Sequence, residues 1–167
     1  MDEIRTLTLN DELAFRQFNE SLLNDQSAFA VGGIEDIVDY SDFVSERKLL
    51  ETESQNSDWS PMTTYYFFRD GVICGKTDCR WELDKGNLAT IGGHIGYTTA
   101  PAYRQQGIMT ELLAFSLDRY RERGIVPVLI TAAKENLASR RTIEKQGGQF
   151  ESYIEGDNRV LARYWIK

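Results

Sequence analysis

The sequence contains few of the residues that build metal centres and disulfide bridges. Two cysteines and one histidine occur among its 167 residues, and no Cys-x-x-Cys pair is present, so we expect no metal site. Cys74 and Cys79 are five positions apart in a predicted strand, which would place them on opposite faces and prevent a bridge. We interpret both as packing residues, and free thiols are typical of a reducing cytoplasm.

Long apolar runs and a secretory leader are also lacking. No apolar segment approaches the roughly 20 residues of a membrane-spanning helix. The first residues, MDEIRTLTLNDE, are acidic and lack the basic-then-apolar order of a signal peptide. We therefore expect a cytoplasmic protein with no membrane partner.

Positive charge is scarce in the first third of the chain. Residues 1–60 contain 14 acidic and 4 basic side chains, a net charge of −10, whereas residues 101–145 contain 8 basic and 5 acidic ones, a net of +3. No basic stripe with interleaved aromatic residues occurs, so nucleic acid is disfavoured as a partner. The asymmetry could attract a cation to one region and an anion to another, although an ordinary solvated acidic surface would have the same composition.

Hydrophobic periodicity in the first half predicts a strand, two helices and a meander of strands. Period-two alternation predicts a strand over residues 4–9. Asn10 or Asp11 can cap the helix that follows, and a second, short helix is expected near residues 43–50. β-Forming runs around the hairpin turn Asp70-Gly71 predict three further strands, at residues 63–69, 72–83 and 89–99.

The second half alternates helices with short strands. An apolar stripe from Met109 to Tyr120 predicts a helix that Gly124 terminates. Residues 127–132 form an apolar run that is expected to be a strand inside the sheet, and Asn136 can cap a last helix. Two closing strands are expected at residues 150–155 and 160–166.

One segment has the layout of a phosphate-binding site. A strand ends near Thr99, Pro101 turns the chain, and a polar loop containing Gly107 leads into a helix. Free loop amides and the positive end of the helix dipole would converge there on one point, which can bind a pyrophosphate. Gly107 lets the backbone approach a ligand, and Arg104 adds a charge that matches phosphate oxygens. On spacing alone, a plain strand–loop–helix connection fits equally well.

The residues of this loop resemble a known family. Residues 101–108, Pro-x-Tyr-Arg-x-x-Gly-Ile, are similar to the signature loop of the GNAT acetyltransferases, whose pattern is Arg/Gln-x-x-Gly-x-Gly/Ala. A second segment, Asn136-x-x-Ser139 followed by a glycine, resembles the family's segment that faces the pantetheine arm. The resemblance covers residues 63–155 well and residues 1–60 only by the order of elements.

The resemblance implies a GNAT fold. We therefore expect an α+β architecture with a mixed, mostly antiparallel central sheet of about seven strands, helices on both faces, and a splay between the fourth and fifth strands. Residues 1–167 would form a single acetyltransferase domain. Its parts would be an acceptor side at residues 1–60, an acetyl-CoA-binding core at residues 61–155 and a closing strand at residues 156–167.

The resemblance also implies acetyl-CoA as the co-substrate, without a metal. The pantetheine arm would lie in the splay, against backbone groups of Tyr97, Thr98 and Thr99 and beside the helix of Asn136 and Ser139. The pyrophosphate would lie on the loop formed by Arg104, Gln105, Gln106, Gly107, Ile108 and Met109.

Two positions depart from the family pattern. Met109 replaces the small residue that ends the signature loop, so the helix could sit differently while the loop amides remain free. Ile143 occupies the position at which many relatives have a tyrosine that protonates the leaving thiolate. Ser139 lies one turn earlier on the same predicted helix face, and its hydroxyl could replace that tyrosine.

The reaction of the family requires a neutral amine. An amine with a lysine-like pKa is neutral in only about one molecule in a few thousand at pH 7. His94, the only histidine, is predicted beside the thioester and could titrate near neutrality as the general base. Glu82, on the neighbouring predicted strand, is the second candidate. Either residue could instead be structural, His94 as a hydrogen-bonded core residue and Glu82 as an exposed carboxylate at a strand end.

The sequence thus predicts an N-acetyltransferase that transfers an acetyl group from acetyl-CoA to an amine by direct attack on the thioester. The acidic N-terminal region favours a small cationic acceptor. The alternative is a non-catalytic acyl-CoA-binding or sensing module on the same fold, and the missing tyrosine leaves this open. Acetylation of protein N-termini or lysines is a weaker third alternative. The acceptor's identity is left open, and so is a homodimer.

Overall fold

The strands form two antiparallel sheets in the computed structural model, which describes residues 1–167. The first sheet contains β1, β2, β3 and β4 in sequence order, and the second has the order β5–β7–β6. The strands of the first sheet are β1 (Asp2–Arg5), β2 (Met62–Arg69), β3 (Val72–Arg80) and β4 (Ile95–Thr99). Those of the second are β5 (Val128–Ala133), β6 (Gln149–Glu155) and β7 (Val160–Ile166).

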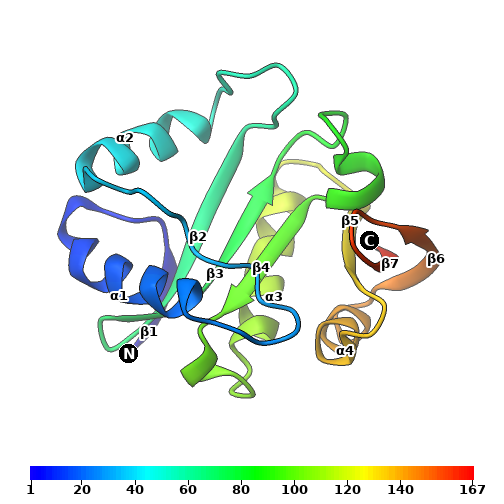
Figure 1. The fold of residues 1–167 in the computed structure, drawn as a ribbon. Helices are drawn as coiled ribbons and strands as arrows, with labels where there is room; N and C mark the ends of the chain where they lie inside the picture. Colours follow the sequence, from blue (N-terminus) through cyan, green and yellow to red (C-terminus); the bar gives the residue numbers. More distant parts are fainter.

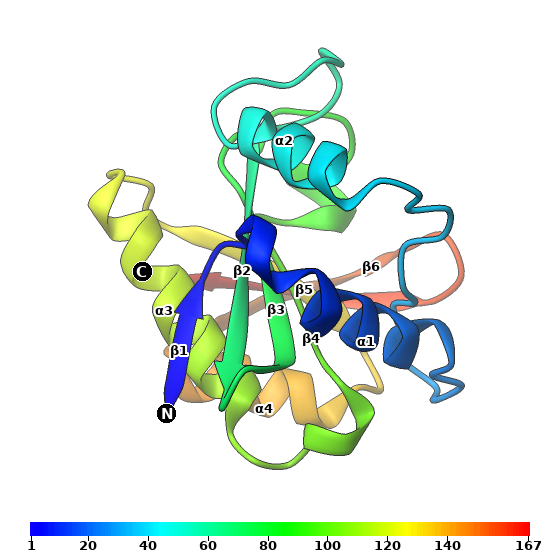
Figure 2. The same cartoon turned by 90° about the vertical axis from the view of Figure 1, so that its left-hand side faces the viewer.

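Four helices cover these sheets from both sides. They are α1 (Glu12–Leu23), α2 (Tyr40–Leu50), α3 (Ile108–Glu122) and α4 (Leu137–Lys145). α1 and α2 lie on one face of the first sheet and α3 lies on the other, as Figures 1 and 2 show together. Each face has its own apolar core, because α1 and α2 pack with Tyr66 and Phe68 of β2, whereas α3 packs with β5 and β7. None of the helices combines the length and apolarity needed to cross a lipid bilayer.

The predicted fold class is confirmed, including the gap between the fourth and fifth strands. The element order follows the expectation, with seven strands that pair antiparallel. No strand ladder joins β4 to β5, which lie at facing edges of the two sheets. β5 is therefore a buried edge strand beside the splay, and the expectation that it lies inside a sheet is wrong.

The strand expected at residues 4–9 is shorter than its alternation suggests. β1 ends at Arg5, because Thr8 caps a short 3₁₀ helix at Leu9–Asp11. The carboxylate of Asp11 accepts hydrogen bonds from the backbone N–H of Thr8 (2.7 Å) and from the guanidinium of Arg5 (2.7 Å). A local capping box therefore overrides the period-two pattern.

The strand expected at residues 89–99 also begins later. Residues 88–92 form a single turn of π-helix, and β4 starts only at Ile95. Arg163 of β7 donates hydrogen bonds to the carbonyl oxygens of Ala89 (2.8 Å) and Thr90 (2.6 Å), so the turn is held by a residue more than 70 positions away. Such a partner cannot be recognised from local periodicity.

The two cysteines are free and buried, but they do not lie on opposite faces. Cys74 packs with Ile108 and Leu112 of α3, and Cys79 packs with Leu113 of the same helix. The reason is a shift in the β2–β3 register next to Cys74, because a β-bulge adds a residue and reverses the alternation beyond it.

Tyr120 of α3 links the helix to the start of β4. Its buried hydroxyl lies 2.7 Å from the carbonyl oxygen of Arg80 and 2.8 Å from that of His94. We expect Tyr120→Phe to lower the free energy of unfolding by about 1–2 kcal/mol, because it removes a buried hydroxyl whose single hydrogen is shared between the two carbonyl oxygens. Tyr153→Phe, at a half-exposed residue of β6, is the control and should change stability by less than about 0.5 kcal/mol. Urea denaturation measures both, and equal effects would contradict the assigned role.

Candidate active site

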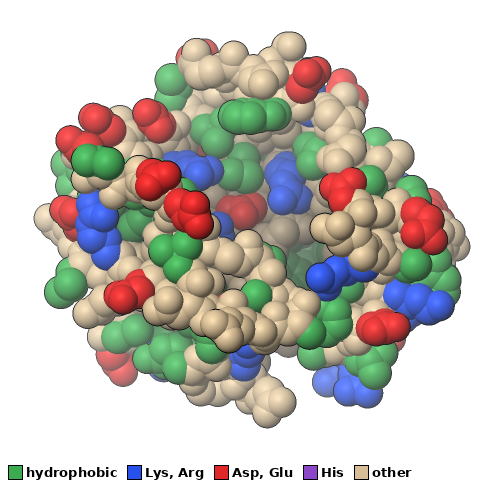
Figure 3. Space-filling model, viewed as in Figure 1, with side chains coloured by type: hydrophobic (Ala, Val, Ile, Leu, Met, Phe, Trp, Pro, Cys, Tyr) green, Lys and Arg blue, Asp and Glu red, His purple; other side chains and the backbone are tan.

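A groove opens where β4 and β5 separate. The two strands meet at one end, where the N–H of His94 donates to the carbonyl oxygen of Leu129 (2.8 Å). Beyond this point they diverge and leave a groove of about 670 Å³. Its lining comes from β4, β5, the start of α3 and the start of α4, and Figure 3 shows the hollow on this face of the molecule.

The open edge of β4 presents unpaired backbone groups to the groove. The N–H of Ala100 bonds the carbonyl oxygen of Cys74, and the N–H of Arg80 bonds that of His94 (both 2.8 Å). Hydrogen-bonding direction alternates along a strand, so the backbone groups of Tyr97 and Thr99 point away from β3 and into the splay. Thr98 lines the groove, but its backbone groups belong to the β3 ladder, and its predicted backbone role is wrong.

The loop before α3 leaves its backbone amides free, as the sequence predicts. Gln105 and Gly107 both have positive φ angles, of 62° and 79°. The backbone N–H groups of residues 105–109 donate no hydrogen bond to the protein. They lie at the positive end of the α3 dipole. A Cβ built on Gly107 would contact no protein atom, so the space above it is open to a ligand.

The side chains of this loop are arranged differently from the expectation. The buried stripe of α3 begins at Ile108, whereas Met109, which was expected on that stripe, is only partly buried and lines the groove. Gln106 does not line the groove; its side-chain oxygen accepts a hydrogen bond from Arg69 (2.9 Å). Its backbone N–H stays free with the others.

Arg104 does not present a free charge to the loop. Its guanidinium forms an ion pair with Asp25 (2.5 Å) and donates to the hydroxyl of Ser27 (3.2 Å). The hydrogen bond from Arg104 lowers the pKa of Asp25 to about 2, so the pair is charged at neutral pH. The expectation that Arg104 is available to phosphate is therefore wrong for this conformation, because an acidic partner from the α1–α2 connection occupies it.

Asn136 and Ser139 lie at the start of α4, as predicted. The side chain of Asn136 caps the helix by accepting from the N–H of Ser139 (3.3 Å). The hydroxyl of Ser139 lies 2.9 Å from that of Tyr97, so a hydrogen bond crosses from β4 to α4. Burial raises the pKa of Tyr97 to about 12, which keeps its phenol protonated at neutral pH.

Ile143 does not share the groove-facing side of α4. It is fully buried in the core with Ile130 and Tyr164, so the expectation that it lies beside Ser139 at the cofactor is wrong. Ile143 lies one turn after Ser139 on α4, and at this distance along the amphipathic helix its side chain already faces the core and not the groove.

His94 is a structural residue at the point where the two sheets meet. Its Nδ1 accepts a hydrogen bond from the N–H of Leu129 (2.9 Å), and its ring packs edge-on against Tyr120. Burial lowers its pKa to about 4, so the prediction that it titrates near neutrality is wrong. It also does not line the groove.

Glu82 follows the end of β3 and is exposed. Its backbone N–H donates to the hydroxyl of Ser60 (2.9 Å), and the residue does not line the groove. A part in proton transfer stays a prediction for this residue. The groove lining contains no carboxylate and no imidazole.

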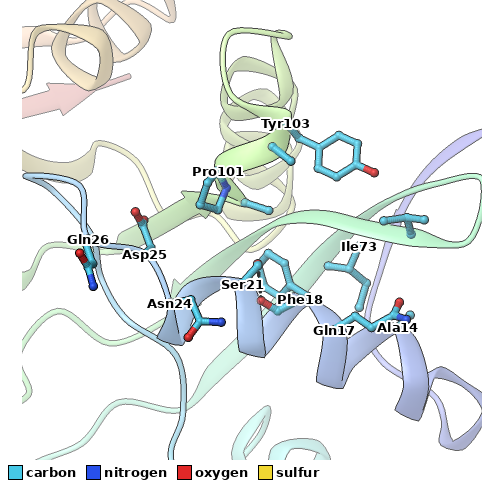
Figure 4. A pocket seen from close by; sticks show the side chains of 13 residues that line it. Ala14, Gln17, Phe18, Ser21, Asn24, Asp25, Gln26, Ile73, Pro101 and Tyr103 are labelled. Carbon is cyan, nitrogen blue, oxygen red and sulfur yellow. Dashed lines mark hydrogen bonds between the residues drawn. The ribbon is translucent and has the colours of Figure 1, made fainter.

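A second cavity, of about 420 Å³, lies between α1 and the turn at Pro101–Tyr103 (Figure 4). Phe18 and Ile73 form its floor, and amide and hydroxyl side chains from the end of α1 border it. Asp25 is its single charged residue and is already paired with Arg104. This cavity therefore offers neutral amide groups but no unpaired charge, and it lacks the helix N-terminus that the β4–β5 groove provides.

The face of β3 that α1 and α2 cover carries a row of three charged side chains that the sequence analysis did not predict. Lys76, Asp78 and Arg80 alternate along the strand. Arg80 lines the groove itself, and so do the β4 partners of Lys76 and Asp78, which are Thr98 and Gly96. The signal was present as charge at every second position of a predicted strand, which places all three side chains on one face.

Comparison with known proteins agrees with this geometry. The family model described as the acetyltransferase (GNAT) family matches residues 33–148, and the chain belongs to this family. A search of curated protein sequences found no match.

Solved structures share the fold across the whole chain at low sequence identity. The acetyltransferase of the GNAT family from Streptococcus pneumoniae has a TM-score of 0.68 at 17% identity, with 100% of both chains covered. The protein yncA of Salmonella typhimurium, solved with its cofactor acetyl-CoA, has a TM-score of 0.64 at 15% identity, covering 99% of this chain and 93% of that one. The ribosomal-protein-S18-alanine N-acetyltransferase of Escherichia coli has a TM-score of 0.61 at 16% identity, with 99% and 93% covered.

The buried, neutral state of His94 has a measurable consequence for stability. Its folded-state pKa of about 4 lies below the unfolded value of about 6.5, so the unfolded chain binds more protons and stability falls as the pH drops from 7 towards 4. Between pH 7 and pH 5 the protonation of His94 in the unfolded chain lowers the free energy of unfolding by about 2 kcal/mol. In His94→Asn the amide oxygen can still accept from Leu129 without titrating, so this part of the loss should disappear. Urea denaturation at both pH values tests this, and parallel losses in the two proteins would contradict it.

Proposed function

We propose that this protein is an N-acetyltransferase that transfers the acetyl group of acetyl-CoA to a small amine. The observation that carries the proposal is the continuity of the groove, which runs from the open edge of β4 to the unbonded amides before α3. An extended arm with a diphosphate at one end fits this layout, since edge groups of a strand bind an extended chain and a helix N-terminus binds the anion. In this proposal residues 1–167 form one domain, whose first 60 residues wall the acceptor side.

The residues present fit acetyl-CoA as a co-substrate. Acetyl-CoA supplies the acetyl group as a reactive thioester. The loop amides of residues 105–109 would hold the pyrophosphate, and the backbone groups of Tyr97 and Thr99 would hold the pantetheine arm. Asn136 and Ser139, at the start of α4, would flank that arm. Because the loop follows the end of β4, the thioester would lie towards the start of the strand, near Gly96 and Tyr97.

Tyr97 is the best placed proton donor for the leaving sulfur. Its hydroxyl meets that of Ser139 at the groove wall, whereas Ile143, at the position of the missing family tyrosine, is buried in the core. In the reaction the amine nitrogen bonds to the carbonyl carbon, the carbon–sulfur bond breaks, and the sulfur takes a proton. A neutral phenol can donate a hydrogen bond to that sulfur while Ser139 orients it.

No group of the groove lining can accept the proton of an ammonium ion at neutral pH. We therefore propose that the amine reacts from its small neutral fraction and that its proton leaves to water. The alternative is a sensing module that binds acyl-CoA without turnover. Release of free thiol from acetyl-CoA in the presence of an amine panel decides between them, because a sensor would bind CoA and release no thiol with any amine.

Gly107 tests the proposed pyrophosphate site. Gly107→Ala places a side chain in the open space above the loop and strains a backbone with φ of 79°, at about 1–2 kcal/mol. Gly124→Ala is a matched control, since Gly124 has φ of 72° and equally open surroundings but ends α3 far from the groove. We expect both variants to lose similar stability and only Gly107→Ala to weaken CoA binding, by tenfold or more. Thermal-shift titration with CoA measures this, and unaltered CoA affinity in Gly107→Ala would refute the site.

The hydroxyl pair predicts unequal effects of two substitutions. Tyr97→Phe should lower kcat by about 10²-fold or more, as loss of a general acid does, whereas Ser139→Ala should lower it by less than tenfold because the phenol remains. Tyr103→Phe is the control, since Tyr103 lines the other end of the groove and should leave kcat unchanged. A larger loss in Ser139→Ala than in Tyr97→Phe would make the serine the donor instead.

A further inference from the structure

Three charged side chains lie in a row on the central strand β3, on the face that α1 and α2 cover. Lys76 pairs across the sheet with Tyr66, which packs in the apolar cluster of α1 and α2, and directly opposed residues share a face. Asp78 and Arg80 follow at every second position. The side chains of Lys76 and Asp78 are each only 19% exposed. Charges are seldom withdrawn from water in this way unless they are paired.

The row borders the end of the groove at which the reaction would occur. Lys76 lies opposite Thr98 and Asp78 lies opposite Gly96 on β4, and both of these residues line the groove. The guanidinium of Arg80, which lines the groove too, reaches within 3.1 Å of the place where a Cβ of Gly96 would stand. Gly96 has no side chain, so the guanidinium of Arg80 fills that side of β4 and is the member of the row that lines the groove, whereas Lys76 and Asp78 lie beside it behind Thr98 and Gly96.

Asp78 is fixed as a carboxylate. Burial acts to raise its pKa, but Lys76 and the hydrogen bond from Thr64 outweigh it, so the pKa is lowered. The hydroxyl of Thr64 donates to its carboxylate at 2.7 Å, and the Nζ of Lys76 lies at 3.5 Å. A permanently ionised carboxylate of this kind can hold an ammonium group but is a poor general base.

The cations around Asp78 outnumber it. Arg80 donates to two uncharged acceptors, the carbonyl oxygens of Gly92 (3.1 Å) and Gly93 (3.4 Å), so its charge is not neutralised. Arg47 of α2 also acts on Asp78, and its own contact is with the ring of Phe43. One carboxylate therefore faces three cations, and the hollow in Figure 3 has both kinds of charge on its floor. The surplus favours a ligand with a negative group.

We propose that the acceptor is an amine that also carries a carboxylate, as an amino acid does. Asp78 holds the amino group next to Gly96, and Lys76 and Arg80 bind the carboxylate. Alternate positions of a strand are about 7 Å apart, a spacing that suits two charged groups on one small molecule. This refines the cationic acceptor expected from the acidic N-terminal region, and it rests on the proposed acetyl transfer.

The test compares acceptors that differ only in the carboxylate. Amino acids with α, β and γ amines are each assayed beside the matching carboxamide, with thiol release from acetyl-CoA as the readout. The carboxamide has the lower amine pKa and hence more neutral amine at pH 7, so intrinsic reactivity favours it. We expect the intact protein to prefer a carboxylate form by at least tenfold in kcat/KM. Lys76→Met should remove most of this preference by raising KM, and Lys76→Arg should retain it.

Lys145→Met, at an exposed position of α4, is the matched control and should leave the preference unchanged. Equal rates for acid and amide, or turnover only of peptide N-termini whose carboxylate is blocked, would overturn the acceptor class while acetyl transfer stands. If no amine releases thiol although CoA still stabilises the protein against heat, both this inference and the proposed function fail.

Discussion

The site depends on the junction at which β4 and β5 touch and then part. Gly93 has φ of 71°, and a Cβ there would approach the carbonyl oxygen of Leu129 to 2.9 Å, so this approach requires glycine. His94 then bonds both backbone groups of Leu129, one with its own N–H and the other with Nδ1. These two hydrogen bonds join β4 to β5, which are not paired by a strand ladder. The ring must stay neutral to accept, and it cannot also serve as a base in the groove.

The N-terminal region is held at the groove by one ion pair and by hydrogen bonds from a second arginine. Residues 27–31 line the groove together with Arg104 and Arg159. Arg104 ties the start of this segment to the loop before α3 through Asp25, and Arg159 donates to the carbonyl oxygen of Ala28 (3.4 Å). The acidic residues of the first third therefore do not simply surround an acceptor. Several of them pair with arginines elsewhere, so the carboxylate paired with Lys76 of β3 is Asp78 of the same strand.

The sequence predicted what local chemistry determines. The hairpin at Asp70-Gly71, the cap at Asn136 and the glycine before α3 each act within a few residues, and all three lie as expected. The failures share a different cause. The partners of Arg104 and His94, and the bonds that hold the turn at residues 88–92, are more than 30 positions away. No window of the sequence contains both members of such a contact, so a charge that looks free or a histidine that looks titratable is assigned the wrong environment.

The alternation of β4 explains how one short strand can serve both ends of the proposed reaction. Gly96 faces α1 and α2 and exposes its backbone to the charged row of β3. Tyr97, the next residue, points to the opposite face, where it packs towards α3 and meets Ser139 of α4. The acceptor would therefore approach from one side of the strand, and the Tyr97 hydroxyl, the proposed proton donor to the leaving sulfur, lies on the other. Gly96 leaves room for the acceptor on one face and Tyr97 supplies a hydroxyl on the other, so no titrating residue has to serve both steps.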